Sequence, residues 1–286
     1  MLKEIAKQLL PPIATNLIEN LVNVTKHKHY ANYAEALKNC SQDGYENTVL
    51  MDVLTYKMER LLENRRTNPV LELNASQTHL FLAFARLMAA YPDRTEFTVL
   101  DFGGGMGGHY LDTKKLLGDN IKLRWAVVET PAMVKAARQF ATSELLFFDD
   151  IHAAKQHLGA IDLFHTSGTL QCVDAPYDFL KIMLDIKAPF MLFNRLGLNR
   201  LNRDVVTIHH SKLSWNGTAG LPPNVADRII SYPFTFISEA NFRGKVSENY
   251  QIIGQFSDTS GLIAVPNTDL IGLGLLVERK KLSRAN

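Results

Sequence analysis

The sequence predicts an α/β protein in which a helical N-terminal region precedes a doubly wound, mostly parallel sheet. Two patterns point to this class. In the first third of the chain, apolar residues recur every three or four positions, and no strand signal stands before Phe97. From Phe97 onward, short apolar runs alternate with helical segments. Strands that alternate with helices form a parallel sheet covered by helices on both faces.

The N-terminal region, residues 1–95, is expected to be mostly helical. Apolar residues repeat at helical spacing over residues 51–64 and 78–91. Residues 1–24 show the same spacing, but charged residues and a pair of prolines interrupt it. Neither a signal peptide nor a membrane span is therefore expected. A packing helix or an interfacial helix remains open for residues 1–10.

Residues 96–286 are expected to form a Rossmann-like domain with a seven-stranded sheet. The strands are predicted at residues 97–102, 123–129, 145–148, 160–165, 189–194, 250–256 and 270–278. The helices are predicted at residues 109–117, 131–142, 151–158, 177–186 and 238–243. Thr130 and Pro131 suit the start of the second of these helices, and the last two strands are expected to pair as a hairpin. Right-handed crossovers then bring the carboxyl ends of the strands to one ligand-binding edge.

Residues 196–236 interrupt this alternation. They contain few periodic apolar residues and several glycines and prolines. We therefore expect a long irregular insert after the fifth strand, and such inserts usually serve as lids or substrate loops.

Composition excludes some classes of function. The chain has 286 residues with a formal net charge of +2 and no block of like charges, so an extended nucleic-acid surface is not expected. Its only two cysteines, Cys40 and Cys172, lie far apart and lack metal-ligand spacing. No metal centre is predicted, and a reducing cytoplasm fits this cysteine usage.

The turn after the first expected strand is rich in glycine and follows an acid. Gly103, Gly105 and Gly108 fit the dinucleotide pattern G-x-G-x-x-G. Asp101 together with Gly103, Gly105 and Gly107 fits D-x-G-x-G-x-G, the first motif of class I S-adenosylmethionine (SAM) methyltransferases. A carboxylate is a poor neighbour for a pyrophosphate at a helix N-terminus, but it suits the sulfonium and ammonium groups of SAM. Asp101 thus favours SAM over a dinucleotide.

The chain resembles the class I SAM methyltransferases. It also resembles a bacterial family of such proteins often encoded with polysaccharide or other biosynthetic genes. The segments that carry the second resemblance are 101–110 (DFGGGMGGHY), 125–131 (WAVVETP), 167–171 (SGTLQ), 194–196 and 231–238 (SYPFTFIS). The resemblance implies an aspartate where Asn194 stands and an aromatic residue where Cys172 stands. Both positions are expected near the acceptor, so the family's substrates do not transfer to this chain.

The strand ends supply candidate cofactor ligands. Glu129 ends the second expected strand and suits the two ribose hydroxyls of a nucleoside, although it could be a solvated acid. Phe148 and Asp149 suit the adenine, and Asp150 could instead cap a helix. The expected cofactor-binding residues are Asp101, Gly103, Gly104, Gly105, Gly107, Glu129, Thr130, Phe148, Asp149, Asp150, Thr166 and Ser167.

Methyl transfer from SAM is an in-line displacement at carbon, so catalysis consists mainly of positioning the acceptor. A base is needed only if the acceptor keeps its proton until late. The candidates for this base are His165, His109, Tyr110, His209 and the adjacent His210. Arg195 is a candidate for binding a carboxylate or phosphate on the acceptor. Each of these side chains could instead be structural.

The sequence therefore predicts a SAM-dependent methyltransferase (EC 2.1.1.-) of the cytoplasm that uses SAM as its cofactor. It would methylate an oxygen or nitrogen atom of a small biosynthetic molecule, such as a sugar or a secondary-metabolite intermediate. The insert and the N-terminal helices would form the acceptor pocket, unless those helices form a homodimer contact. An NAD-dependent oxidoreductase and a catalytically inactive methyltransferase-fold binding protein are the alternatives.

Overall fold

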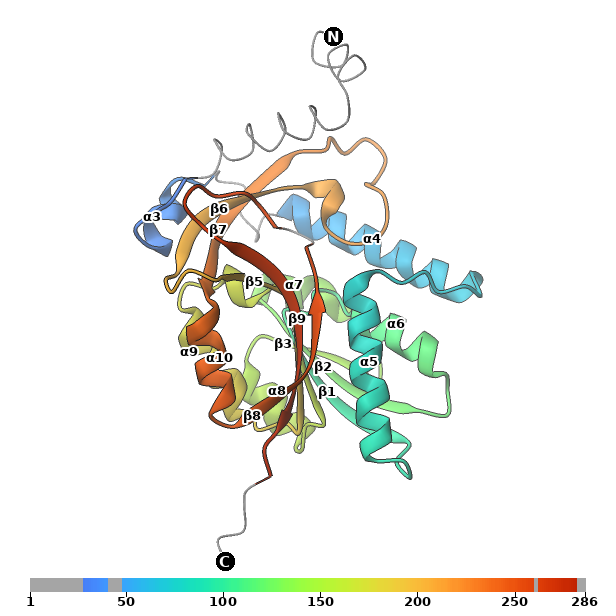
Figure 1. Ribbon diagram of the computed structural model, residues 1–286. Helices are drawn as coiled ribbons and strands as arrows, with labels where there is room; N and C mark the ends of the chain where they lie inside the picture. Colours follow the sequence, from blue (N-terminus) through green and yellow to red (C-terminus); the bar gives the residue numbers. More distant parts are fainter. Residues whose placement is uncertain (1–27, 41–47, 260–261, 282–286) are drawn as a thin grey trace, which may run out of the picture.

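The computed structural model describes residues 28–40, 48–259 and 262–281, and it shows an α/β molecule built on one large sheet (Figure 1). The strands are β1 (Glu96–Phe102), β2 (Lys122–Val128), β3 (Leu145–Phe148), β4 (Leu163–Ser167), β5 (Phe190–Asn199), β6 (Val205–Lys212), β7 (Ile229–Ser238), β8 (Tyr250–Ser257) and β9 (Leu270–Arg279). The helices are α3 (Tyr33–Lys38), α4 (Thr48–Thr67), α5 (Ala75–Ala90), α6 (Gly108–Leu117), α7 (Pro131–Ala137), α8 (Ile151–Leu158), α9 (Pro176–Asp185) and α10 (Glu239–Ser247).

Seven strands form the expected mostly parallel sheet. β3, β2, β1, β4 and β5 pair side by side in parallel. β9 pairs antiparallel with β5, and β8 pairs antiparallel with β9. The order is thus β3-β2-β1-β4-β5-β9-β8, with β9 alone reversed. The predicted fold class and the predicted terminal hairpin are confirmed.

Helices cover both faces of this sheet (Figure 1). On one face, apolar residues of α4, α5, α6 and α7 form a core with Phe97, Val99 and Trp125. On the other face, α8, α9 and α10 pack on a second core that includes Leu100 and Phe164. Because side chains of a strand alternate between faces, neighbouring residues such as Val99 and Leu100 belong to different cores.

The segment after β5 differs from the expected irregular insert. β6 and β7 form a regular antiparallel hairpin, paired from Val205↔Phe236 to Lys212↔Ile229. The prediction of an irregular insert was wrong: it rested on the scarcity of periodic apolar residues and on several glycines and prolines, of which Pro233 lies within a strand. β7 pairs with β6 along its length but with β5 over only two residues, so it is largely an edge strand, where proline is tolerated.

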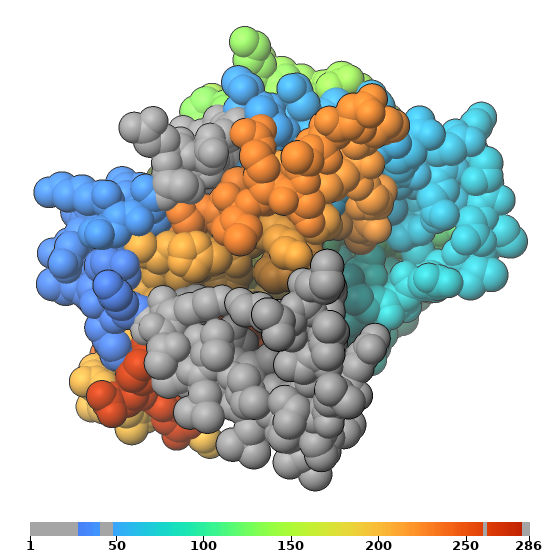
Figure 2. All heavy atoms as spheres, turned by 90° about the horizontal axis from the view of Figure 1, so that it is seen from above, coloured from blue at the N-terminus to red at the C-terminus, as the bar shows by residue number. Residues whose placement is uncertain are grey.

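The described part of the N-terminal region packs on the hairpin and on one face of the sheet. α3 lies against β6 and β7, and Figure 2 shows the hairpin (orange) between α3 and α4 (both blue). On α4, the buried Lys57 donates hydrogen bonds to the backbone oxygens of Leu213, Ser214 and Asn216 beyond β6. Residues 1–10, for which a packing or interfacial helix was considered, lie outside the described residues. None of the described helices is long and apolar enough to span a membrane.

Candidate active site

The glycine turn after β1 leaves its backbone open at one point. Gly103, Gly105 and Gly107 have φ angles of 74°, 60° and 90°, which residues with a Cβ rarely adopt. A Cβ at Gly103 would also collide with the side chain of Thr169. A Cβ at Gly105 would have no neighbour within 4 Å among the residues that the structure describes. The backbone at Gly105 is therefore accessible to a ligand.

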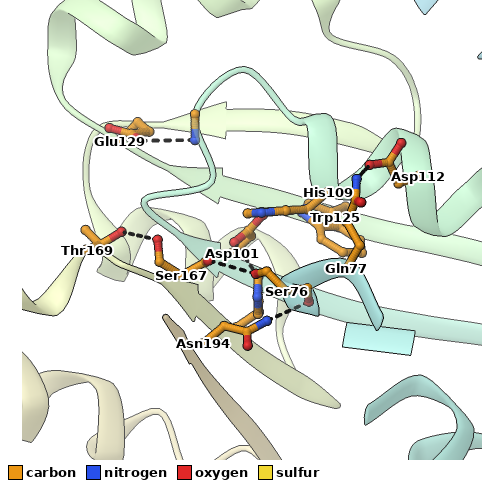
Figure 3. Close-up of polar contacts among 12 residues, drawn as sticks. Ser76, Gln77, Asp101, His109, Asp112, Trp125, Glu129, Ser167, Thr169 and Asn194 are labelled. Atoms are coloured by element: carbon orange, nitrogen blue, oxygen red, sulfur yellow. Dashed lines mark hydrogen bonds and ion pairs between the residues drawn. The ribbon is translucent and has the colours of Figure 1, made fainter. Parts of the chain in front are cut away.

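Asp101 lies beneath this turn and is fully buried. Its Oδ1 accepts a hydrogen bond from Nδ1 of His165 (2.8 Å), and its Oδ2 accepts one from Nδ1 of His109 (3.0 Å). The indole nitrogen of Trp125 also donates to Oδ2 (3.3 Å). A Cβ at Gly104 would overlap the carboxylate, so glycine allows the turn to lie directly on Asp101 (Figure 3).

The three groups form one charged cluster. Burial would raise the pKa of Asp101, but the two imidazoles hold it below its usual value. Burial lowers the pKa of His109, yet the negative charge and hydrogen bond of Asp101 outweigh it and raise that pKa. For His165 burial dominates, and its pKa is lowered. Asp101 therefore favours its ionised form, His109 keeps its proton to a higher pH than a free imidazole does, and His165 favours its neutral form.

Two histidines and an aspartate are also a common metal-ligand set, and their donor atoms lie within 4.8 Å of one another. Both Nδ1 atoms, however, lie at hydrogen-bond distance from the carboxylate. We therefore describe the cluster as hydrogen-bonded, and the absence of a metal centre stays a prediction.

Glu129 follows β2 and lies beside the open face of the turn. Its Oε1 accepts a hydrogen bond from the backbone nitrogen of Gly105 (3.0 Å; Figure 3). Its Oε2 accepts one from the backbone nitrogen of Thr130 (3.0 Å). Burial raises the pKa of the Glu129 carboxyl, although these two hydrogen bonds oppose the rise. The side chain is only half-buried. A carboxylate at the end of the second strand of such a fold suits the hydroxyls of a ribose.

Two of the predicted cofactor residues cap helices. The side chain of Asp150 accepts a hydrogen bond from the backbone nitrogen of Ala153 (2.7 Å) and begins α8. Thr130 caps α7 in the same way through Met133. Asp149 is exposed beside the half-buried Phe148 at the end of β3. Because Asp150 caps the helix, Asp149 is the acid left for the predicted contact with the adenine.

The end of β4 is tied to the start of α5. Ser167 lies 3.2 Å from Ser76, measured between their hydroxyl oxygens. The amide of Asn194, in the next strand, donates to the backbone oxygen of Ser76 (2.8 Å) and pairs with Nδ1 of His79 (2.9 Å) (Figure 3). Neither Ser76 nor His79 was predicted from the sequence. Only the capping box of Asn74 and Gln77, which starts α5, marks this segment locally.

Other predicted residues lie in packing positions. The Tyr110 hydroxyl donates to the carboxylate of Glu144 (2.9 Å), and burial, with Glu144, raises its pKa to about 12. Its ring meets Trp125 edge-on, with the centroids 6.0 Å apart. Thr166 is buried, and its hydroxyl has no hydrogen-bond partner among the described residues. We leave Tyr110 out of the proposed site.

Arg195 occupies a bulge in the middle of β5 (Phe190–Asn199), one residue beyond the last pair of β5 with β4, Ser167↔Asn194. The pairing of β5 with β9 shifts register between Phe193 and Leu196, and Arg195 has a φ angle of 49°. The side-chain amide of Gln171 donates to the Arg195 backbone oxygen (2.7 Å). A Cβ at Gly168 would lie 3.5 Å from Cζ of Arg195, so the guanidinium rests against this glycine.

A cavity lies beside Arg195, bounded by β5, the β6–β7 hairpin and the segment between β8 and β9. His209 lines it and stacks on Tyr232 and Phe234, with centroid distances of 5.3 Å to each. His210, the next residue, is exposed. The structure thus brings Arg195 and His209 to one cavity, while Asp101, His109 and His165 form a separate cluster beneath the turn.

Comparisons with known proteins concern the fold. No protein-family model and no curated protein matches the chain. Among solved structures, it is similar to CalS10, an amino pentose methyltransferase from Micromonospora echinaspora (14% identity, 78% of this chain and 97% of that chain, TM-score 0.45). It is also similar to a SAM-dependent methyltransferase from Clostridium acetobutylicum (9% identity, 78% of this chain and 98% of that chain, TM-score 0.43). A third similar structure is DesVI from Streptomyces venezuelae (14% identity, 73% of this chain and 100% of that chain, TM-score 0.42).

The strand order is what decides the fold. Five parallel strands in the order β3-β2-β1-β4-β5 are completed by the reversed β9 and then by β8. The glycine turn with its preceding acid follows the central strand β1. This is the class I methyltransferase fold. In such doubly wound sheets ligands bind at the carboxyl ends of the strands, where the glycine turn, Glu129 and Arg195 lie.

Proposed function

We propose that the protein is a SAM-dependent methyltransferase that acts on an oxygen or nitrogen atom of a small biosynthetic molecule. The observation that carries this proposal is the pairing of the accessible backbone at Gly105 with the Glu129 carboxylate. Together they provide a nucleoside site at the carboxyl edge of a sheet with the class I order.

The residues present fit SAM. Each Glu129 oxygen accepts one backbone hydrogen bond and retains a lone pair for a ribose hydroxyl. Asp149 and Phe148 stand at the end of the neighbouring strand for the adenine. The ionised Asp101 lies under Gly104, and when His109 is neutral it gives the cluster a net negative charge that suits a cationic ligand. When bound, SAM supplies a methyl group already activated by its positively charged sulfur.

The remaining chemistry belongs to the acceptor side. Arg195 is exposed at the strand ends, where it would bind an anionic group of the acceptor and so orient it. If a proton must be removed, His109 is better placed than His165, because 25% of its side chain is exposed whereas His165 is fully enclosed. Above the raised pKa of His109, where the ring is neutral, its Nδ1 would donate to Asp101 and its Nε2 would be available for the acceptor proton.

Ligand binding to the purified protein tests the proposal. S-adenosylhomocysteine and SAM should raise the melting temperature and give a measurable dissociation constant in isothermal titration, whereas NAD should not. Stabilisation by NAD with no response to the adenosyl ligands would instead support an oxidoreductase. Binding of SAM with no methyl transfer to any tested small molecule would favour the inactive binding protein.

A further inference from the structure

We propose that the cavity beside Arg195 binds the methyl acceptor and that this acceptor is a single aromatic ring bearing an anionic group and a hydroxyl or amine. The inference rests on the proposed function and adds the substrate class. It follows from three features of the cavity: an aromatic wall, a guanidinium at one end, and a buried amide oxygen. Neither of the last two has a hydrogen-bond partner within the described part of the chain.

The aromatic wall comes from the β6–β7 hairpin. Tyr232, Phe234 and Phe236 alternate along β7 and therefore point to one face. His209 on β6 stacks on the first two, and the rings of Phe234 and Phe236 lie 4.8 Å apart at 54°. Aromatic side chains pair favourably with a planar ring. Phe234 and Phe236 are buried, so the half-buried Tyr232 and His209 form the part of this wall that a flat apolar group would contact.

Arg195 provides the charge. Its guanidinium makes no hydrogen bond or ion pair with another residue in the described part of the chain, and Gln171 and Gly168 hold its backbone and side chain in place. A guanidinium in this state is suited to a carboxylate or phosphate, which it binds through two parallel hydrogen bonds. Asp258 also lines the cavity and would repel an anion. The anionic group therefore belongs at the Arg195 end.

Gln171 requires a donor from the ligand. Its side chain is 3% exposed, and its amide nitrogen is used by the Arg195 backbone, but Oε1 has no partner among the described residues. A buried acceptor without a hydrogen bond is costly. A hydroxyl or amine on the ring would satisfy it. Cys172, also in the cavity, does not compete as an anion, because burial raises the pKa of its thiol to about 12.

The cavity adjoins the proposed cofactor edge. Thr169 contacts the glycine turn at Gly103, and the preceding Gly168 contacts the Arg195 guanidinium. Arg195 thus stands between the turn and the aromatic wall. An acceptor held by Arg195 would present its ring substituents beside the carboxyl end of β4, on the side where the glycine turn lies.

The test measures binding of four probes by titration in the presence of saturating S-adenosylhomocysteine. The probes are 4-hydroxybenzoate, 2-aminobenzoate, neutral 4-hydroxybenzamide and the saturated 4-hydroxycyclohexanecarboxylate. We expect at least one of the two aromatic acids to bind about tenfold or more tightly than the amide and the saturated acid. Against the amide, this is the range for loss of a charge-assisted hydrogen-bond pair. The saturated acid keeps its carboxylate, and its loss comes from the missing aromatic ring contacts.

Variants locate the site. Arg195→Gln should abolish the preference for the acid over the amide and leave S-adenosylhomocysteine binding unchanged. Arg200→Gln, which removes an exposed ion pair with Asp269, is the matched control and should preserve the preference. Phe234→Leu should reduce the preference for the aromatic over the saturated ring.

The outcomes separate the two proposals. If S-adenosylhomocysteine binds but neither aromatic acid does, or if the amide or the saturated acid binds equally well, this inference is overturned and the proposed function stands. If S-adenosylhomocysteine itself does not bind, the proposed function fails. A preference for the acid that survives in Arg195→Gln would also overturn the assignment.

Discussion

Replacing Glu129 by alanine is the sharpest test of the nucleoside site. The substitution removes both proposed acceptors for the ribose hydroxyls and also frees the backbone nitrogens of Gly105 and Thr130. Hydrogen bonds to charged groups contribute about 1.5–3 kcal/mol each. Because Glu129 is half-buried, water replaces part of what is lost. We expect the free energy of S-adenosylhomocysteine binding to become less favourable by about 1–3 kcal/mol, which raises the dissociation constant roughly 5- to 150-fold.

Isothermal titration of wild type and Glu129→Ala with S-adenosylhomocysteine measures this loss. The 2′-deoxy analogue of S-adenosylhomocysteine serves as a second ligand and completes a double-mutant cycle. Glu129→Ala should weaken its binding less, because this analogue lacks one of the two ribose hydroxyls that Glu129 would bind. Glu63→Ala, at an exposed ion pair on α4, is the control and should bind both ligands as wild type does. An unchanged dissociation constant in Glu129→Ala would show that Glu129 is only a surface acid.

Three further predictions concern the cluster, the turn and the hairpin. The pKa of His109 is raised, so its proton persists above the ordinary value near 6.5 and repels a cation. The affinity for SAM divided by that for S-adenosylhomocysteine, both measured by isothermal titration, should therefore rise as the pH rises through that pKa. A ratio that does not change with pH in the wild type would refute this, and so would a ratio that still rises in His109→Gln. Gly103→Ala should distort the turn at φ 74° and abolish ligand-induced stabilisation, whereas Gly118→Ala, at φ 73° beyond α6, should cost stability but retain that response. Lys57→Met leaves three backbone oxygens of the hairpin without their donor and should lower the free energy of unfolding by about 1–3 kcal/mol. Amide hydrogen exchange at residues 213–216 should then become faster. Unchanged protection of these amides would contradict the role of Lys57.

Much of the fold was predictable because its signals are local. The apolar run that forms β3 was predicted with its exact bounds, and Thr130 and Asp150 begin helices as expected from their ability to cap. The glycine turn was also recognisable, since positive φ angles after an apolar strand require glycine. Such features depend on the chemistry of a few consecutive residues.

The hairpin after β5 was missed for the opposite reason. Whether a proline is tolerated in a strand depends on whether that strand lies at an edge. For Pro233 this was decided by the pairing of β7 with β6 on one side and the short contact with β5 on the other. No local pattern around Pro233 contains that information, so the cavity formed by the hairpin was also outside the reach of sequence analysis.

The same division holds for Asp101. Its position before the glycines was enough to predict an acid at the carboxyl end of β1 and to favour a cationic ligand over a pyrophosphate. That its carboxylate is shared between two imidazoles was not predictable, because His165 lies 64 positions away and meets Asp101 only through the register of β1 with β4. Local residue chemistry determines which backbone conformations and which ligand charges are possible. The pairing of distant strands determines which side chains meet, and hence which protons they hold.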